Sequence, residues 1–179
     1  MITQFQGLTV RELEEKDQPF LVKWLSDPEV LQFYEGRDQP FDLEKVKQEF
    51  YEIDDGVTKC IVEYKGERIG YIQFYKVEAY YREKFGYKSE RTFGLDQFIG
   101  EVDYWNKGIG TTLVKNMARY LLNRENADHV VMDPQTQNHR ALRCYEKSGF
   151  KIVKLLPKHE WHEGAYRDCW LMEYQQNIE

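Results

Sequence analysis

RTFGLDQFIGEVDYWNKGIGTTLVKNMARYLLNR, residues 91–124, predicts a strand, a glycine turn and a helix in one continuous run. Residues 92–99 are rich in side chains that favour a pleated, half-buried surface. Asp96 is their one carboxylate. After a polar loop, apolar side chains recur every four positions, which predicts an amphipathic helix with one face formed by Ile109, Leu113, Met117 and Leu121.

The turn at residues 107–111 has the features of an anion site. The first turn of a helix leaves amide N–H groups unpaired and carries the positive end of the helix dipole. Gly108 and Gly110 place no side chain in the way of a phosphate, and Lys107 adds a positive charge. The turn matches neither Gly-x-Gly-x-x-Gly nor the P-loop motif. A Gly-x-Gly alone is equally compatible with a tight turn that binds no ligand.

A second block, NHRALRCYEKSGF at residues 138–150, follows about thirty residues later. Its pattern, Asn-x-x-Ala-x-x-x-Tyr-x-x-x-Gly-Phe, resembles the second cofactor helix of the GCN5-related N-acetyltransferases. The strand GLDQFIG, the Asp133-Pro134 pair and the string RCYEKSGF together resemble one branch, the bacterial aminoglycoside 6'-N-acetyltransferases, over nearly the whole chain. One departure is Trp105, since the superfamily usually has Gln or Arg three residues before the first glycine of its pyrophosphate loop.

The resemblance implies an α/β (α+β) fold, with a mixed, mostly antiparallel central sheet of about seven strands flanked by about four helices. The whole chain, residues 1–179, is then expected to be one N-acetyltransferase domain. The implied activity is acetyl-CoA-dependent acetylation of the 6'-amine of aminoglycosides, which confers antibiotic resistance, by direct amine attack on the thioester in a ternary complex. Two alternatives stay open: acetylation of another small amine, such as a siderophore precursor or a polyamine, and a non-catalytic acyl-CoA-binding domain.

The resemblance also assigns residues to the cosubstrate acetyl-CoA. Backbone groups of the central strand are expected to pair with the pantetheine arm, the glycine turn to hold the pyrophosphate, and one asparagine side chain to contact the arm. Tyr145 is expected to donate a hydrogen bond or proton to the leaving sulfur, with a packed phenol as the alternative. The cofactor-binding set is Gln97, Phe98, Ile99, Lys107, Gly108, Ile109, Gly110, Thr111 and Asn138.

Carboxylates are the candidates for the acceptor, because they attract a protonated amine and can accept its proton. Asp96 is the expected catalytic base and an acceptor-binding group, with a structural carboxylate as its alternative. Asp133 lies at the C-terminal end of a predicted strand, where α/β sheets place ligands, although it could instead accept hydrogen bonds from the next loop. Tyr34 and Glu35 lie in the connection that forms one wall of the acceptor site in the superfamily.

Composition limits the partners. The formal net charge is −6 and no run of Lys or Arg occurs, which argues against nucleic acid and anionic membranes and favours a polycationic small molecule. Three scattered cysteines and the absence of a leader or long apolar run predict reduced thiols in a cytoplasmic protein. No metal is expected, because His159 and His162 lie in a connection without a partner motif. The sequence leaves open whether the protein is a monomer or a homodimer.

The remaining pattern fixes the expected element boundaries. Strands are predicted at residues 8–13, 59–65, 68–76, 129–133, 150–156 and 168–174, with residues 157–166 as a connection. Asp17 and Asp42 are expected to cap two helices. An aromatic, charged insertion that contains Tyr80, Tyr81, Phe85 and Tyr87 is expected either to pack over the substrate or to cover the sheet edge.

Overall fold

The computed structural model describes residues 1–176, which contain eight strands and six α-helices. The strands are β1 (Thr3–Phe5), β2 (Leu8–Glu12), β3 (Thr58–Tyr64), β4 (Glu67–Lys76), β5 (Thr92–Ile99), β6 (His129–Met132), β7 (Phe150–His162) and β8 (Ala165–Tyr174). The helices are α1 (Gln18–Trp24), α2 (Pro28–Leu31), α3 (Leu43–Val46), α4 (Ala79–Phe85), α5 (Ile109–Arg124) and α6 (His139–Ser148). The predicted mixed sheet with flanking helices is confirmed, with β1, α2 and α4 added to the expected elements.

The sheet order is β1-β2-β3-β4-β5-β6-β8-β7. By contacts the chain divides into two compact units, Met1–Gln73 with Asp96–Trp105 and Phe74–Leu95 with the chain from Asn106 onward, so that β4 and β5 supply residues to both. Within the described residues, no helix is long and apolar enough to cross a bilayer.

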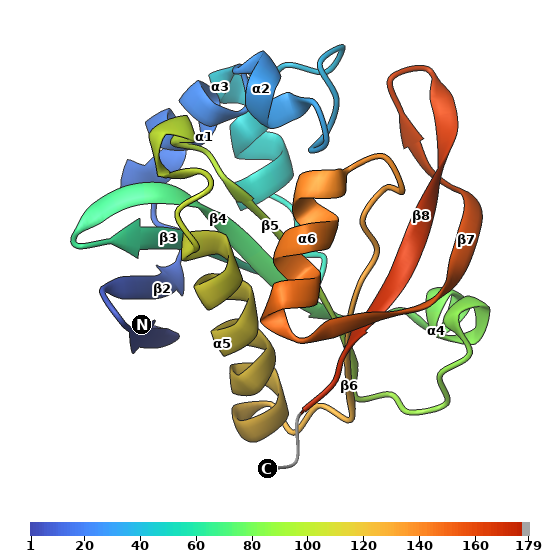
Figure 1. Ribbon diagram of the computed structural model, residues 1–179. Coiled ribbons are helices and arrows are strands. Elements are labelled where there is room, and N and C mark those ends of the chain that lie inside the picture. The colour runs from blue at the N-terminus through green and yellow to red at the C-terminus, as the bar shows by residue number, and fades with distance from the viewer. Residues whose placement is uncertain (177–179) are drawn as a thin grey trace. The chain divides into compact units, whose positions relative to one another are not determined.

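The first unit pairs β1, β2 and β3 as antiparallel neighbours, and α1, α2 and α3 gather beside one another in Figure 1. Asp42 caps α3 as expected, because its Oδ1 accepts from the Lys45 amide at 2.8 Å. The helix then continues into a π-helical turn at Lys47–Tyr51.

The core of the first unit is aromatic: Trp24 and Tyr71 are fully buried, with ring centroids 6.1 and 5.5 Å from that of Phe98.

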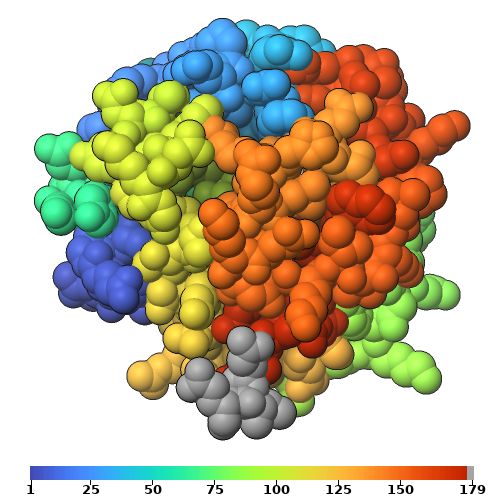
Figure 2. Space-filling model, in the orientation of Figure 1, coloured from blue at the N-terminus to red at the C-terminus, as the bar shows by residue number. Residues whose placement is uncertain are grey.

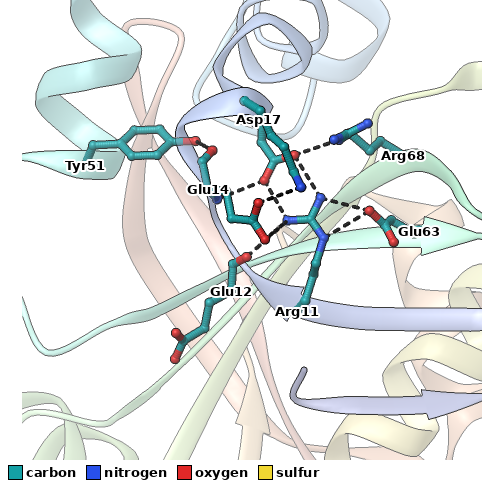
Figure 3. Close-up of polar contacts among 8 residues, drawn as sticks. Arg11, Glu12, Glu14, Asp17, Tyr51, Glu63 and Arg68 are labelled. Atoms are coloured by element: carbon teal, nitrogen blue, oxygen red, sulfur yellow. Dashed lines mark hydrogen bonds and ion pairs between the residues drawn. The ribbon is translucent and has the colours of Figure 1, made fainter.

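Asp17 does not cap α1, contrary to the sequence-based expectation. Its fully buried carboxylate instead accepts two hydrogen bonds from Arg11, at 2.8 and 2.9 Å, and one from Arg68 Nε at 2.7 Å (Figure 3). The Glu14 amide also donates to Asp17, and Arg11 reaches on to Glu63 at 2.8 Å. Burial raises the pKa of Asp17, but these hydrogen bonds outweigh burial and lower it to about 2.

In the second unit β5 pairs with β6 in parallel, and Thr92 lies opposite His129. Helices α5 and α6 lie side by side in Figure 1, and Ser148 Oγ donates to Thr111 O at 3.2 Å between them. Figure 2 shows α6 and the β7–β8 hairpin forming much of the surface of this unit on the side viewed. Leu113, Met117 and Leu121 are fully buried, so the predicted apolar face of α5 is confirmed.

The prediction of a loop at residues 157–166 is wrong. β7 continues to His162 and β8 begins at Ala165, joined by a tight turn in which Glu163 and Gly164 both have positive φ. Pro157 lies inside β7, where the pairing with β8 shifts register between Leu156 and Glu160. Because β7 is at the end of the sheet order, a missing amide there breaks no ladder on its outer side.

The aromatic insertion contains a helix. α4 ends at Gly86, whose left-handed φ of 91° suits a C-terminal glycine. Phe85 is buried in a cluster with Val131, Leu156 and Leu171. This ring therefore covers the sheet, which was one of the two expectations for the insertion. Tyr80 is 72% exposed, so only part of the insertion packs against the sheet.

Candidate active site

The predicted site residues are divided between the two units. Tyr34, Glu35, Asp96, Gln97, Phe98 and Ile99 lie in the first unit, and Lys107, Gly108, Ile109, Gly110, Thr111, Asp133, Asn138 and Tyr145 lie in the second.

Asp96 is half-buried near the C-terminal end of β5 and is held by a neighbouring strand. Gln73 of β4 donates from Nε2 to Asp96 Oδ2 at 2.8 Å, and Gln73 Oε1 accepts from the Tyr71 hydroxyl at 2.6 Å. Burial raises the pKa of Tyr71, so its hydroxyl keeps its proton and acts as a donor. The hydrogen bonds from Tyr71 to Gln73 and from Gln73 to Asp96 therefore orient the Asp96 carboxylate through a neutral amide.

Tyr34 packs against the aromatic core, with its ring centroid 4.6 Å from that of Phe98 and 6.5 Å from that of Tyr71. Glu35 is exposed and has a left-handed φ of 65°, immediately before Gly36 with a φ of 110°. The two residues thus differ: the Tyr34 ring is half-buried and packs against the core, whereas Glu35 presents its carboxylate at a turn.

The end of β5 carries the three residues predicted to pair with a pantetheine arm. Phe98 points into the core at 7% exposure, so only its backbone is available to a ligand. The Trp105 indole donates from Nε1 to Ile99 O at 2.7 Å. Trp105, the one departure from the superfamily pattern, is therefore a structural residue that ties the loop after β5 back to the strand.

The turn before α5 has the predicted shape. Gly108 is the N-cap, with a φ of 77°, and a Cβ added there would meet nothing within 4 Å. The first helical bond runs from Thr112 N to Gly108 O at 3.1 Å, so the amides of Gly110 and Thr111 precede the helical ladder. With Lys107 exposed beside them, these groups fit an anionic ligand such as a pyrophosphate.

Gly110, predicted from the sequence to leave room for a phosphate, also faces the neighbouring helix α6. A Cβ at Gly110 would lie 3.4 Å from Cys144 Sγ on α6, so its hydrogen faces the neighbouring helix. Thr111 Oγ1 also donates to Cys144 Sγ at 3.7 Å. Burial raises the pKa of the Cys144 thiol, which disfavours a thiolate nucleophile here. Gly110 is thus a close-packing residue between α5 and α6.

α6 and its N-cap carry one predicted cofactor-binding residue, Asn138, and one predicted catalytic residue, Tyr145. Asn138 caps the helix, since its Oδ1 accepts from the Ala141 amide at 3.3 Å, and its NH₂ group remains on the opposite side of the side chain. Tyr145 is 6% exposed, with its ring centroid 6.3 Å from that of Phe150. Both residues therefore have structural contacts, and their roles toward a cofactor stay predictions.

Asp133 follows β6 and is 34% exposed at its side chain. Its Oδ2 lies 2.8 Å from His159 Nε2 on β7. Nearby, buried Gln135 donates to Glu160 Oε2 at 2.7 Å. Burial raises the pKa of Glu160 and the charge of Asp133 adds to this, whereas the bond from Gln135 works against it. In residues 1–176, no group of three or more His, Cys, Asp or Glu side chains could hold a metal ion.

Sequence reasoning missed Gln73 and His159. Gln73 is a polar residue within a strand that is otherwise buried at its centre, and such a residue signals a hydrogen-bond partner on a neighbouring strand. His159 had been considered only as a metal ligand, and the strand that carries it had been predicted as a loop.

Comparison with known proteins identifies the family. Residues 14–157 match the family model described as an acetyltransferase (GNAT) domain. Aminoglycoside N(6')-acetyltransferase type 1 of Klebsiella pneumoniae is 29% identical over 152 residues, which cover 81% of this chain and 74% of the relative.

Solved structures give the same result. Aminoglycoside acetyltransferase AAC(6')-Ib in complex with coenzyme A and kanamycin has a TM-score of 0.79 at 26% identity, covering 94% of this chain and 95% of that chain. Spermidine N-acetyltransferase from Vibrio cholerae, in complex with coenzyme A and spermine, has a TM-score of 0.75 at 19% identity over 93% and 94% of the two chains, which shows the fold alone. The chain therefore belongs to the GNAT acetyltransferase family.

Proposed function

We propose that this enzyme transfers the acetyl group of acetyl-CoA to the 6'-amine of aminoglycosides and so confers resistance to them. The observation that carries the proposal is the Asp96 carboxylate, oriented by Gln73 on a central strand, in a chain whose relatives acetylate aminoglycosides at that amine. An acidic protein with a net charge of −6 suits a polycationic acceptor.

The cosubstrate supplies an acetyl thioester, and the chain supplies groups that bind and orient it. Lys107 and the amides from Ile109 to Thr111 would bind the pyrophosphate, because they combine a cation with the N-terminal groups of a 16-residue helix. The left-handed Gly108 leaves open space on this side of the turn. Backbone groups of Gln97, Phe98 and Ile99, with the Asn138 amide, would hold the pantetheine arm.

The acceptor amine must lose a proton before or during attack. Asp96 would position the ammonium group and accept its proton, directly or through water. Gln73 suits this role because an amide donor orients the carboxylate without replacing its negative charge by an ion pair. Tyr145 would donate to the departing sulfur.

Further carboxylates would bind the rest of the polycation. Asp133 is partly exposed and carries one hydrogen bond from His159, which leaves acceptor sites on the carboxylate. Tyr34 and exposed Glu35 would contribute one wall, an aromatic ring followed by an anion. We propose that both units act as one domain, for which unfolding followed by two different probes should give one coincident transition.

The experiment that tests the function measures thiol release from acetyl-CoA with a panel of amines. Kanamycin should be turned over, and NMR of the product should place the acetyl group on the 6'-nitrogen. An aminoglycoside with a hydroxyl in place of the 6'-amine is the matched control. Turnover of spermine but of no aminoglycoside would instead support a polyamine acetyltransferase, and binding of acetyl-CoA without any turnover would support a non-catalytic domain.

A further inference from the structure

His159 links the aromatic insertion to the Asp133 carboxylate. Its side chain, on β7, is only 6% exposed although β7 is an edge strand. Two rings of α4 enclose it: the centroids of Tyr81 and Phe85 lie 6.0 and 5.8 Å from that of the imidazole. Packing therefore fixes the plane of the imidazole before any hydrogen bond is considered.

Both ring nitrogens of His159 have polar neighbours. Nδ1 lies 2.9 Å from Lys84 Nζ on α4, and Nε2 lies 2.8 Å from Asp133 Oδ2. A lysine ammonium has only donors, so Nδ1 must accept the hydrogen bond from Lys84. The proton of the neutral ring then resides on Nε2, and the Nε2–H group donates to Asp133.

Lys84 on one side of the ring and the Asp133 carboxylate on the other select the same tautomer, and the ring that α4 holds in place in turn holds the carboxylate. Asp133 is 34% exposed, and without a fixed partner such a side chain would sample several rotamers. Holding it in one orientation before the acceptor arrives removes an entropic cost from binding. The insertion that carries Lys84 thus reaches the acceptor site through one histidine.

We propose that His159, held by Lys84 and by two rings of α4, is a positioning residue for Asp133 and thereby determines affinity for the aminoglycoside. The proposal rests on the proposed function for its kinetic consequence, but the hydrogen-bonding geometry that it requires exists in the enzyme without any acceptor. The two parts can therefore be tested separately.

The kinetic test compares variants at position 159. His159→Ala should raise the KM for kanamycin about tenfold, the worth of one hydrogen bond to a charged group, while kcat and the KM for acetyl-CoA change less than about twofold. His159→Gln places an amide donor near the position of Nε2 and should recover most of the affinity. In the Asp133→Asn background, His159→Ala should have little further effect, because its target is already changed.

The tautomer is tested by NMR of protein labelled with ¹⁵N at histidine. In the wild type at neutral pH, His159 should show the Nε2–H tautomer. Lys84→Met retains the side-chain stem but removes the donor to Nδ1, so it should shift the ¹⁵Nδ1 resonance of His159 and raise the KM for kanamycin. Lys88→Met, at an exposed lysine just beyond α4, is the matched control and should change neither quantity.

Three results would overturn the proposal: an Nδ1–H or imidazolium form in the wild type, an unchanged KM in a folded His159→Ala variant, or a fall in kcat that equals the change in kcat/KM. A wild-type enzyme that neither binds nor acetylates aminoglycosides would refute the proposed function instead. The NMR comparison would still decide whether Lys84 donates to Nδ1 of His159.

Discussion

Gln73 Nε2 lies 2.8 Å from Asp96 Oδ2, although the two residues are 23 positions apart on neighbouring strands. The bond joins the carboxylate proposed as the catalytic base to an amide that itself accepts from Tyr71. Because an amide stays neutral at any working pH, it holds the carboxylate in place while leaving it able to accept a proton. This relationship gives two predictions.

Asp96→Asn should leave a folded enzyme that binds both substrates but turns over about 10²–10⁴-fold more slowly, the usual contribution of a general base. The wild-type rate should fall at low pH as the base is protonated, and the variant should lose that limb. Steady-state kinetics across pH, with a thermal melt to verify folding, measures both. Near-normal turnover would exclude the catalytic-base role.

Gln73→Leu should lower kcat about tenfold, because it retains the size of the side chain but removes a hydrogen bond to a charged group. Gln48→Leu is the matched control: its amide donates to Glu44 at 3.1 Å on an exposed helix, and its loss should not affect catalysis. Equal kcat values for the two variants would mean that the carboxylate does not depend on Gln73.

Gly110→Ala should change coenzyme A affinity less than about threefold, because a Cβ 3.4 Å from Cys144 Sγ is close to ordinary contact. Gly110→Val should lower both affinity and stability, by about 1–3 kcal/mol for the latter, because its extra methyl groups overpack the α5–α6 interface. The sequence alone predicts an effect on coenzyme A binding with little effect on the fold, and the contact with Cys144 adds the expected loss of stability.

Calorimetric titration with coenzyme A and denaturant unfolding measure the two effects of Gly110→Val. Adding Cys144→Ala should restore part of the stability, because it removes the sulfur that the new side chain meets. A fully stable Gly110→Val that binds no coenzyme A would favour direct obstruction of the phosphate instead.

Asp17→Asn should destabilise the protein by about 3–5 kcal/mol, because it leaves Arg11 and Arg68 without their shared buried counter-charge. Asp55→Asn is the control: this more exposed carboxylate pairs with Lys59 at 3.0 Å, and its loss should cost less than about 1 kcal/mol. Urea unfolding of both variants distinguishes a buried network from a surface pair.

The wild type should also show the Asp17 network in its acid stability. The folded pKa of Asp17 is lowered from 3.8 to about 2, so the folded state binds this proton more weakly than the unfolded chain. The contribution, on the order of 2 kcal/mol, is present above about pH 4 and is lost as pH falls towards 2. Asp17→Asn should lack this part of the pH dependence.

Local signals in the sequence were sufficient for the glycine turn and α5, because the periodic apolar residues and Gly108 act within one short segment. They were insufficient for Asp17. The sequence predicts that its carboxylate caps a helix, but in the structure the carboxylate accepts a hydrogen bond from Arg68, 51 residues away. The Asp133–His159 contact spans 26 residues between two strands, one of which had been predicted only in part. Hydrogen bonds between polar groups that lie far apart in the sequence could therefore not be predicted from local patterns.

Pro157 shows the same limit at the level of an element. A proline usually ends a strand, and residues 157–166 were predicted as a connection between two strands. On β7 the proline coincides with a register shift, and the strand continues for five more residues to His162. Only the position of β7 at the sheet edge makes this possible, and edge position is a property of the whole fold.

β7 also bears on how the protein behaves at high concentration. Ile152, Val153 and Leu155 are each nearly half exposed on this long edge strand, a composition that invites neighbouring molecules to add strands and aggregate. Lysines at 151, 154 and 158, together with Pro157 and the two register shifts, interrupt such a template. We expect these residues to keep the enzyme dispersed when a cell accumulates it in large amounts.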